Sequence, residues 1–242
     1  TGNTAAIVGY NYQGTVTHCG NHGSLTSTAN TSNLAGIVGR YEPSAADAEG
    51  KVQGLIESCY NAGDINGVNN VGGIVGVTVK NTATIKDCFN KGSITGSGTV
   101  AGGIVGSTSS AAVILNCYNI GEVKTSTTTN KSVSNAISGG TYVTLTNCYY
   151  NTTATGTPKT GSSLLTDEQM CNRANFIGWD FNTVWQFNEA VNNSYKYPQL
   201  KGLTFDVPYP EGTVNNPIKI SSQEDFEAIK AEEGLYYIVS ES

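Results

Sequence analysis

The strongest constraint on the fold is a tandem repeat that occupies residues 4–151. An Ile-Val-Gly block recurs, and each repeat later carries a cysteine three positions after an aliphatic residue. Successive cysteines are 40, 29, 29 and 31 residues apart. A period of this length predicts a solenoid, because one repeat can bury its apolar face only by stacking on the next. The repeated cysteines are Cys19, Cys59, Cys88, Cys117 and Cys148.

Each repeat holds three short apolar segments separated by turn-forming residues. The segments are too short and too rich in β-branched residues for helix pairs, and they favour strands. The sequence therefore predicts an all-β fold, a parallel β-helix of about five coils with three strands per coil, and we expect a right-handed coil. Stacking would align equivalent side chains into ladders, including one of amides that hydrogen-bond to each other at a turn. This ladder comprises Asn21, Asn61, Asn90 and Asn119.

Two positions in the repeat predict local backbone geometry. The aliphatic residue and the cysteine cannot both face inward along an unbroken strand, because strand side chains alternate. We therefore expect a bend at the polar residue before each cysteine, as at His18 or Asp87. A glycine four residues after the cysteine, as at Gly63 or Gly92, indicates a turn that needs a positive φ or close backbone approach.

The repeat resembles the GLUG motif. The resemblance is carried by Gly-Gly-Ile-Val-Gly at 72–76 and 102–106 and by Cys-(Tyr/Phe)-Asn-X-Gly at 59–63, 88–92 and 117–121. GLUG repeats occur in bacterial surface proteins, in adhesin-like proteins and in non-catalytic parts of IgA-specific metallopeptidases. The resemblance thus implies an extracellular setting, either secreted or on the bacterial cell surface.

The chain after the repeats divides into two segments. Residues 152–206 contain both tryptophans and a capping box at Thr166–Gln169, which predicts a short helix to about residue 174. We interpret this aromatic segment as the C-terminal cap of the solenoid, and a similar segment follows the last repeat in GLUG-type proteins. Residues 207–242 predict a small α/β appendage or the start of a following unit, with a helix over 223–233.

Composition narrows the classes of partner. The formal net charge is −6 and no run of Lys or Arg occurs, so nucleic acid is an unfavourable partner. No apolar stretch approaches the ~20 residues of a membrane-spanning helix, so we expect no direct membrane insertion. We expect a monomer that uses no cofactor. The chain opens within a repeat, which we interpret as a piece cut from a longer protein.

The aromatic residues after the cysteines are the first candidate binding residues. We expect them to form an outward ladder that either shields the sheet from water or stacks on sugar rings. They are Tyr60, Phe89, Tyr118 and Tyr149. The breaks in the repeat are further candidates for specific contacts: an insertion from Tyr41 to Gly54 and a Thr-rich stretch at 125–132.

Cysteines, histidines and carboxylates suggest other chemistry. The ladder position favours free buried thiols, while disulfides and a metal site stay open as alternatives. Cys171 is expected in the core of the cap. His18 and His22 flank Cys19, but no second cluster completes four metal ligands. Asp64 and Glu122 fall on one flank, two coils and roughly 10 Å apart, which is too far for a retaining glycosidase and marginal for an inverting one.

Three functions fit these features. The first is a non-enzymatic surface module, a rigid spacer or adhesin-like scaffold that binds a host or matrix glycan or protein. The second is a polysaccharide-cleaving β-helix enzyme, which fold analogy alone suggests. The third is a non-catalytic recognition arm of a larger secreted peptidase. We expect no enzyme, because the sequence contains none of the common hydrolase, zinc-peptidase or nucleotide-binding motifs.

Overall fold

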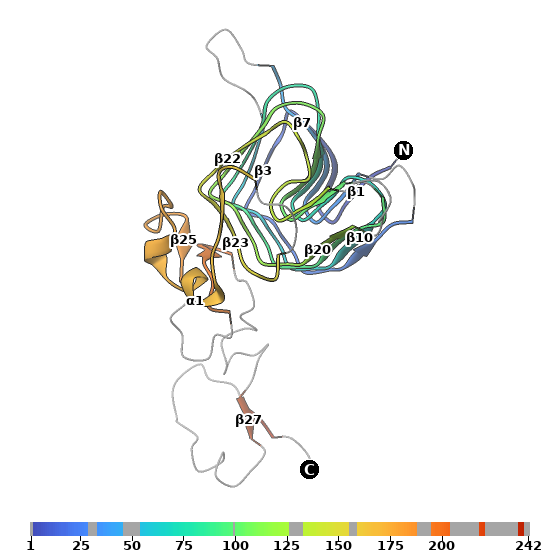
Figure 1. The fold of residues 1–242 in the computed structure, drawn as a ribbon. Coiled ribbons are helices and arrows are strands. Elements are labelled where there is room, and N and C mark those ends of the chain that lie inside the picture. Colours follow the sequence, from blue (N-terminus) through green and yellow to red (C-terminus); the bar gives the residue numbers. More distant parts are fainter. Residues whose placement is uncertain are drawn as a thin grey trace. The chain divides into compact units, whose positions relative to one another are not determined.

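The computed structural model shows a parallel β-helix, as the repeat predicts (Figure 1). It describes residues 2–28, 33–45, 54–98, 100–125, 133–154, 159–187, 195–203, 218–220 and 237–239. Equivalent strands of successive coils pair in parallel, so the sheets run along the axis of the solenoid.

Within the described residues, five parallel sheets surround the axis, which corrects the three strands per coil that the sequence predicted. The Gly-Gly-Ile-Val-Gly region spans two strands separated by a corner, and the aliphatic residue and the cysteine lie on different sides of another bend. The first sheet contains β1 (Asn3–Ala5), β6 (Asn33–Ala35), β11 (Val71–Gly72), β16 (Val100–Gly102) and β21 (Val133–Asn135). The second contains β2 (Val8–Tyr12), β7 (Val38–Glu42), β12 (Val75–Thr78) and β17 (Val105–Thr108).

The other three sheets complete the coil. The third contains β3 (Thr15–Thr17), β8 (Leu55–Glu57), β13 (Ala83–Lys86), β18 (Ala112–Leu115) and β22 (Val143–Thr146). The fourth contains β4 (Gly20–Asn21), β9 (Tyr60–Asn61), β14 (Phe89–Asn90), β19 (Tyr118–Asn119), β23 (Cys148–Tyr150) and β24 (Ser162–Leu164). The fifth contains β5 (Leu25–Thr26), β10 (Ile65–Gly67), β15 (Ile94–Gly96) and β20 (Val123–Thr125).

The predicted bend before each cysteine is confirmed. The residue at this position has a left-handed φ of 50–52° in all five repeats. This conformation reverses the side-chain alternation between the third and fourth sheets, so that the aliphatic residue and the cysteine both face the core. The five residues are His18, Ser58, Asp87, Asn116 and Asn147.

The glycine ladder is set by close backbone approach. A Cβ on Gly92 would lie 2.0 Å from the carbonyl oxygen of Gly63, and one on Gly121 would lie 2.0 Å from that of Gly92. No side chain fits between coils at that spacing, which explains why glycine recurs here.

Ladders of aliphatic and cysteine side chains fill the core. Ile37, Ile74 and Ile104 have no exposed surface, and the same main cluster contains the cysteines of the repeats. A second buried cluster gathers Leu34, Ile65 and neighbouring residues between the first and fifth sheets. The apolar residues that recur in each repeat thus stack on their own kind from coil to coil.

The aromatic segment after the repeats lies beside the solenoid, along the fourth sheet (Figure 1). It contains α1 (Asp167–Met170), the 3-10 turn η1 (Arg173–Asn175) and an antiparallel pair, β25 (Trp185–Gln186) and β26 (Gln199–Leu200). The predicted capping box is present at Thr166, but the α-helix ends at Met170 rather than near residue 174. The strand β24, which lies in the loop between β23 and α1, pairs with β23 and lengthens the fourth sheet by one strand.

The chain divides into two compact units. The first comprises Thr1–Phe187 with Tyr197–Leu203, and the second comprises Asn188–Lys196 with Thr204–Ser242. In the second unit, β27 (Ile218–Ile220) and β28 (Tyr237–Val239) pair in parallel. The helix predicted over 223–233, most of the predicted insertion and the Thr-rich residues 126–132 lie outside the described residues. None of the described helices is long and apolar enough to cross a membrane.

Candidate functional site

The aromatic ladder, which the sequence offered as a binding surface, is stacked but covered. The rings of Tyr60 and Phe89 are 5.1 Å apart and nearly parallel, and those of Phe89 and Tyr118 are 4.9 Å apart. These side chains lie outside the main core cluster, yet Phe89 and Tyr118 have no exposed surface, and Tyr60 and Tyr149 are also buried. Of the two roles that the sequence left open, shielding of the sheet and stacking on sugar rings, the burial of these side chains contradicts the second, because another part of the chain occupies that surface.

Two tryptophans supply that cover. Trp179 and Trp185 stack with 4.3 Å between ring centroids, and Trp185 lies 6.3 Å from Phe89 and 6.0 Å from Tyr118. The Tyr118 hydroxyl donates a 2.7 Å hydrogen bond to the carbonyl oxygen of Pro198. The aromatic segment is thus a lateral cover on the ladder, and the ladder's role here is structural.

The bend residues supply polar anchors for the cover. The indole N–H of Trp185 donates to Oδ1 of Asp87 at 3.2 Å, and that of Trp179 donates to the carbonyl oxygen of Asn147 at 2.9 Å. Asn116 Nδ2 also donates to Asp87 at 3.2 Å. Desolvation by burial raises the pKa of Asp87 above its ordinary value, and the two N–H donors oppose this shift.

The asparagine ladder forms a continuous chain of buried amides. Each Nδ2 donates a 2.7 Å hydrogen bond to Oδ1 of the next coil, from Asn21 through Asn61 and Asn90 to Asn119. Each Nδ2 also donates to the carbonyl oxygen of the glycine two residues later, at 2.7–2.9 Å. Both amide hydrogens of Asn21, Asn61 and Asn90 are therefore used inside the scaffold.

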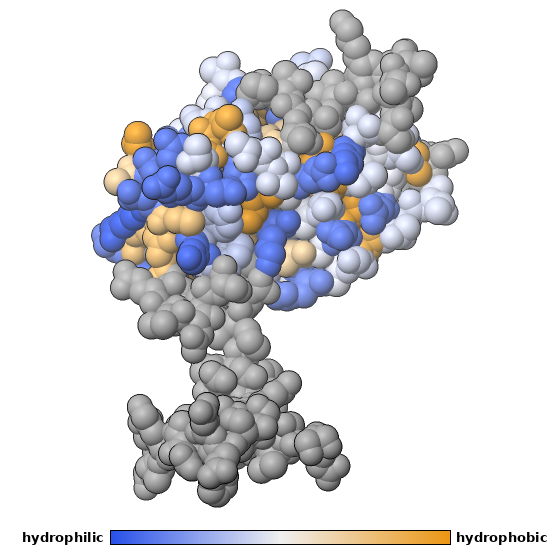
Figure 2. Space-filling view, turned by 60° about the horizontal axis from the view of Figure 1, so that its bottom comes forward, coloured by the Kyte–Doolittle hydropathy of each residue, from blue (hydrophilic) through white to orange (hydrophobic). Residues whose placement is uncertain are grey.

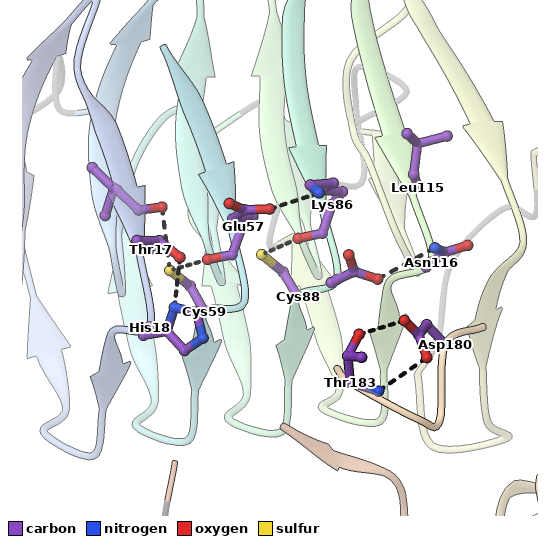
Figure 3. Close-up of polar contacts among 12 residues, drawn as sticks. Thr17, His18, Glu57, Cys59, Lys86, Cys88, Leu115, Asn116, Asp180 and Thr183 are labelled. Carbon is purple, nitrogen blue, oxygen red and sulfur yellow. Dashed lines mark hydrogen bonds and ion pairs between the residues drawn. The ribbon is translucent and has the colours of Figure 1, made fainter. Parts of the chain in front are cut away.

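The cysteine ladder consists of free thiols. The Sγ atoms of Cys59 and Cys88 each donate to the carbonyl oxygen two residues earlier at 3.1 Å (Figure 3). Desolvation by burial raises the pKa of the Cys88 and Cys117 thiols, which keeps them protonated and unreactive. Cys171 is exposed, so its expected place in the core of the cap is wrong. It follows α1 directly, and Met170 fills the buried position of that helix instead.

The histidines and the carboxylate pair have local partners. His18 hydrogen-bonds to Thr17 at 2.7 Å, and His22 shares a 2.6 Å hydrogen bond with the Tyr60 hydroxyl. Asp64 accepts from the backbone N–H of Ser93, and Glu122 pairs with Lys124 at 2.7 Å. In the described part of the chain, no three His, Cys, Asp or Glu side chains gather where they could hold a metal ion.

The structure shows a charged and aromatic cluster on the second sheet that the sequence pattern did not predict. Glu42 is only 2% exposed, and its carboxylate accepts from the Tyr10 hydroxyl at 2.7 Å. The same carboxylate pairs with Arg40 at 3.2 Å and with Lys80 at 2.5 Å. These donors lower the pKa of Glu42 to about 2.

Two tyrosines make this cluster a candidate binding surface. Tyr10 is 47% exposed and Tyr12 is 60% exposed, with 6.3 Å between their ring centroids. The Arg40 guanidinium lies 5.3 Å from the Tyr10 ring centroid, within the range of a cation–π contact. We name the set Tyr10, Tyr12, Arg40, Glu42 and Lys80 the tyrosine–arginine patch. It combines exposed ring faces with fixed charges, a combination suited to binding a polar ligand.

The sequence carried only a weak signal for this patch. Tyr10 and Tyr12 follow the Ile-Val-Gly block of the first repeat with strand alternation, and Arg40 and Glu42 follow the second in the same register. An alignment of these two repeats would have put Tyr10 beside Arg40. Only the structure shows that Lys80, from the turn after β12, reaches the same carboxylate.

Comparison with known proteins supports the fold. No protein-family model matches this sequence. No curated protein matches it either. Among solved structures, the chain is similar to one named "putative immunoglobulin A1 protease" from Bacteroides ovatus, with a TM-score of 0.57 and 18% identity. The match covers 78% of this chain and 57% of that chain. At this identity the likeness shows a shared architecture.

Proposed function

We propose that this chain is a non-enzymatic extracellular scaffold, a rigid spacer in a bacterial protein that is secreted or attached to the cell surface. The observation that carries the proposal is the use of its buried polar groups. The asparagines bond to one another and to glycine carbonyls, and Asp87 bonds to Asn116 and Trp185. The thiols donate to backbone carbonyls. These groups build the column instead of meeting a substrate.

The surface supports the same function. Polar residues predominate on the face seen in Figure 2, and its hydrophobic residues form small separate patches. A surface without a large exposed apolar patch suits a spacer, because such patches mark sites of extensive contact with other molecules. The resemblance to GLUG repeats, which the residues at 72–76 and 102–106 carry, agrees with a place at the bacterial surface.

An adhesin-like role is favoured by the tyrosine–arginine patch. Tyrosine faces stack on sugar rings, and a fixed guanidinium or ammonium adds hydrogen bonds to hydroxyl or carboxylate groups. We therefore propose that any host or matrix ligand, glycan or protein, binds at this patch rather than on the aromatic ladder.

A second reading, a non-catalytic arm of a larger secreted peptidase, is favoured by the name of the Bacteroides ovatus structure and by the 57% of that chain that the match covers. In this case the scaffold would space or orient a peptidase domain. The two readings share the same scaffold and differ in what the rest of the protein does.

A binding screen tests the proposal. The chain is applied to arrays of host glycans and matrix proteins, beside a Tyr10→Ala/Tyr12→Ala variant and a control, Tyr142→Ala, which also removes an exposed tyrosine. Binding that the double variant loses and the control keeps supports the adhesin role. Absence of any binding leaves the spacer role. Release of fragments from a panel of neutral and uronic-acid polysaccharides would overturn the non-enzymatic assignment.

A further inference from the structure

The tyrosine–arginine patch is positively charged where it meets solvent. Its one anion is Glu42, whose side chain is only 3% exposed, and both carboxylate oxygens already accept from other members of the patch. The side chains of Arg40 and Lys80 are 34% and 65% exposed. A ligand at this surface therefore meets a guanidinium and an ammonium, whereas the carboxylate beside them is buried.

The two cations are ordered before a ligand arrives. Lys80 pairs with Oε1 of Glu42 and Arg40 pairs with Oε2, so they stand on either side of one carboxylate. Lysine and arginine lose much rotamer freedom when they are immobilised, and a ligand gains affinity when that cost has already been met. The buried carboxylate thus holds two donors ready for an anion outside the protein.

Both cations belong to interior coils of the solenoid. Arg40 lies on β7, and Lys80 lies in the turn that follows β12. Each of these strands pairs with a neighbouring strand on both sides. The exposure of Arg40 and Lys80 is therefore a property of the lateral surface of the solenoid, where stacked coils leave outward side chains open to solvent.

Tyrosine rings lie beside the cations. The Arg40 guanidinium is 5.3 Å from the Tyr10 ring centroid, and Lys80 interacts electrostatically with both Tyr10 and Tyr12. An aromatic ring offers an apolar face to the C–H groups of a sugar ring, and a carboxylate forms its strongest hydrogen bonds with charged donors. A sugar that carries a carboxylate would use both features at once.

The small extent of the patch favours a sugar over a protein. A stable protein interface covers about 800 Å² on each partner and has an apolar centre. The patch consists of five side chains, three of them charged, and the hydrophobic residues on the face seen in Figure 2 form small separate patches. A site of this size and polarity matches one or two sugar residues.

We propose that the tyrosine–arginine patch binds a carboxylate-bearing sugar of an acidic glycan. Its carboxylate accepts hydrogen bonds from Lys80 and Arg40, and its ring packs on Tyr12. The net charge of −6 does not prevent this, because exposed charges more than about 8 Å away are screened at physiological ionic strength. The inference rests on the adhesin-like role proposed above and narrows its ligand to one chemical class.

The test compares acidic sugars with their uncharged counterparts. Sialyllactose and trigalacturonate are each titrated into the full chain beside the carboxyl-reduced form, and protein NMR chemical shifts give the Kd. Lys80→Gln removes the ammonium of the patch. Lys124→Gln is the matched control, because Lys124 is also an exposed lysine, with a side chain 61% exposed, and also pairs with a glutamate, Glu122. Circular dichroism checks that each variant is folded.

We expect at least one acidic sugar to bind. Carboxyl reduction and Lys80→Gln should each raise its Kd about tenfold or more, because each removes a hydrogen bond between charged groups. Lys124→Gln should leave the Kd unchanged. An acidic sugar whose Kd rises equally in the two lysine variants would overturn the inference.

Three other outcomes would also overturn it. Equal binding of the carboxyl-reduced sugars, lost in Tyr10→Ala/Tyr12→Ala, would keep the adhesin-like role but exclude recognition of the carboxylate. Binding of a hexaglutamate peptide in preference to both sugars would point to a protein ligand. If neither acidic sugar binds, the inference fails, while a hit on the host arrays that needs Tyr10 and Tyr12 would still support the adhesin-like role.

Discussion

The indole N–H of Trp185 donates a 3.2 Å hydrogen bond to the carboxylate of Asp87, 98 positions earlier in the chain. The contact attaches the aromatic segment to a bend of the third repeat, where the indole also covers Phe89 and Tyr118. A residue of the C-terminal segment thus closes a surface that the repeats build but leave uncovered.

Replacing this indole should therefore destabilise the solenoid. Trp185→Ala removes a fully buried side chain, and substitutions of this kind cost about 3–5 kcal/mol. Urea unfolding followed by far-UV circular dichroism measures the loss, with Tyr142→Ala, an exposed position, as the control. If Trp185→Ala unfolds at the same urea concentration as the control, the aromatic segment does not stabilise the repeats.

The amide ladder should be sensitive at an interior coil. Asn90→Ala removes the acceptor of one Asn61 amide hydrogen and one of the two donors to Asn119 Oδ1, both in buried positions. A buried polar group that loses a hydrogen bond in this way costs about 1–3 kcal/mol. The expected loss appears as a lower urea midpoint than that of Thr144→Ala, an exposed strand position. Equal midpoints would mean that water or neighbouring groups replace the ladder bonds.

The glycine ladder offers a test with an internal control. Gly92→Ala puts a Cβ 2.0 Å from the Gly63 carbonyl oxygen, so the two coils must separate. Gly23→Ala changes the same ladder position in the first coil, where the nearest atom is Asn21 Oδ1 at 3.5 Å. Overpacking costs about 1–3 kcal/mol, so we expect a lower unfolding temperature for Gly92→Ala alone. A similar loss in Gly23→Ala would point to glycine's backbone freedom as the cause.

Glu42 should stabilise the fold in a pH-dependent way. Its pKa falls from an ordinary 4.5 to about 2 in the folded chain, so its contribution is complete above pH 4.5 and is lost as the pH falls toward 2. Glu42→Gln should therefore be less stable than the original chain at pH 7, and the difference should shrink on acidification. Unfolding midpoints at pH 7, 4 and 2 test this, with Glu168→Gln as a control for an exposed carboxylate. A difference that is independent of pH would exclude an ionic role.

The repeat could be recognised from the sequence because its characteristic residues recur at a nearly constant spacing along the chain. A fixed period with Asn and Gly at constant offsets from Cys leaves few folds open, and a bend before each cysteine followed from the three-residue separation of two inward side chains. The structure adds that the backbone at this bend is left-handed. The number of strands per coil did not follow. A two-residue strand such as β9 (Tyr60–Asn61) leaves no alternation to detect.

The sequence by itself determined the parallel coils, the bend at positions such as Asp87, and which residues would stack on their counterparts, because each of these depends on spacing that repeats along the chain. Only the tertiary structure decided that Trp185 covers Phe89 and that Lys80 and Tyr10 share the Glu42 carboxylate. The physical reason is that these outcomes depend on groups brought together across coils or from outside the repeat. A periodic pattern specifies how one coil meets the next, and it carries no information about what lies on the flank.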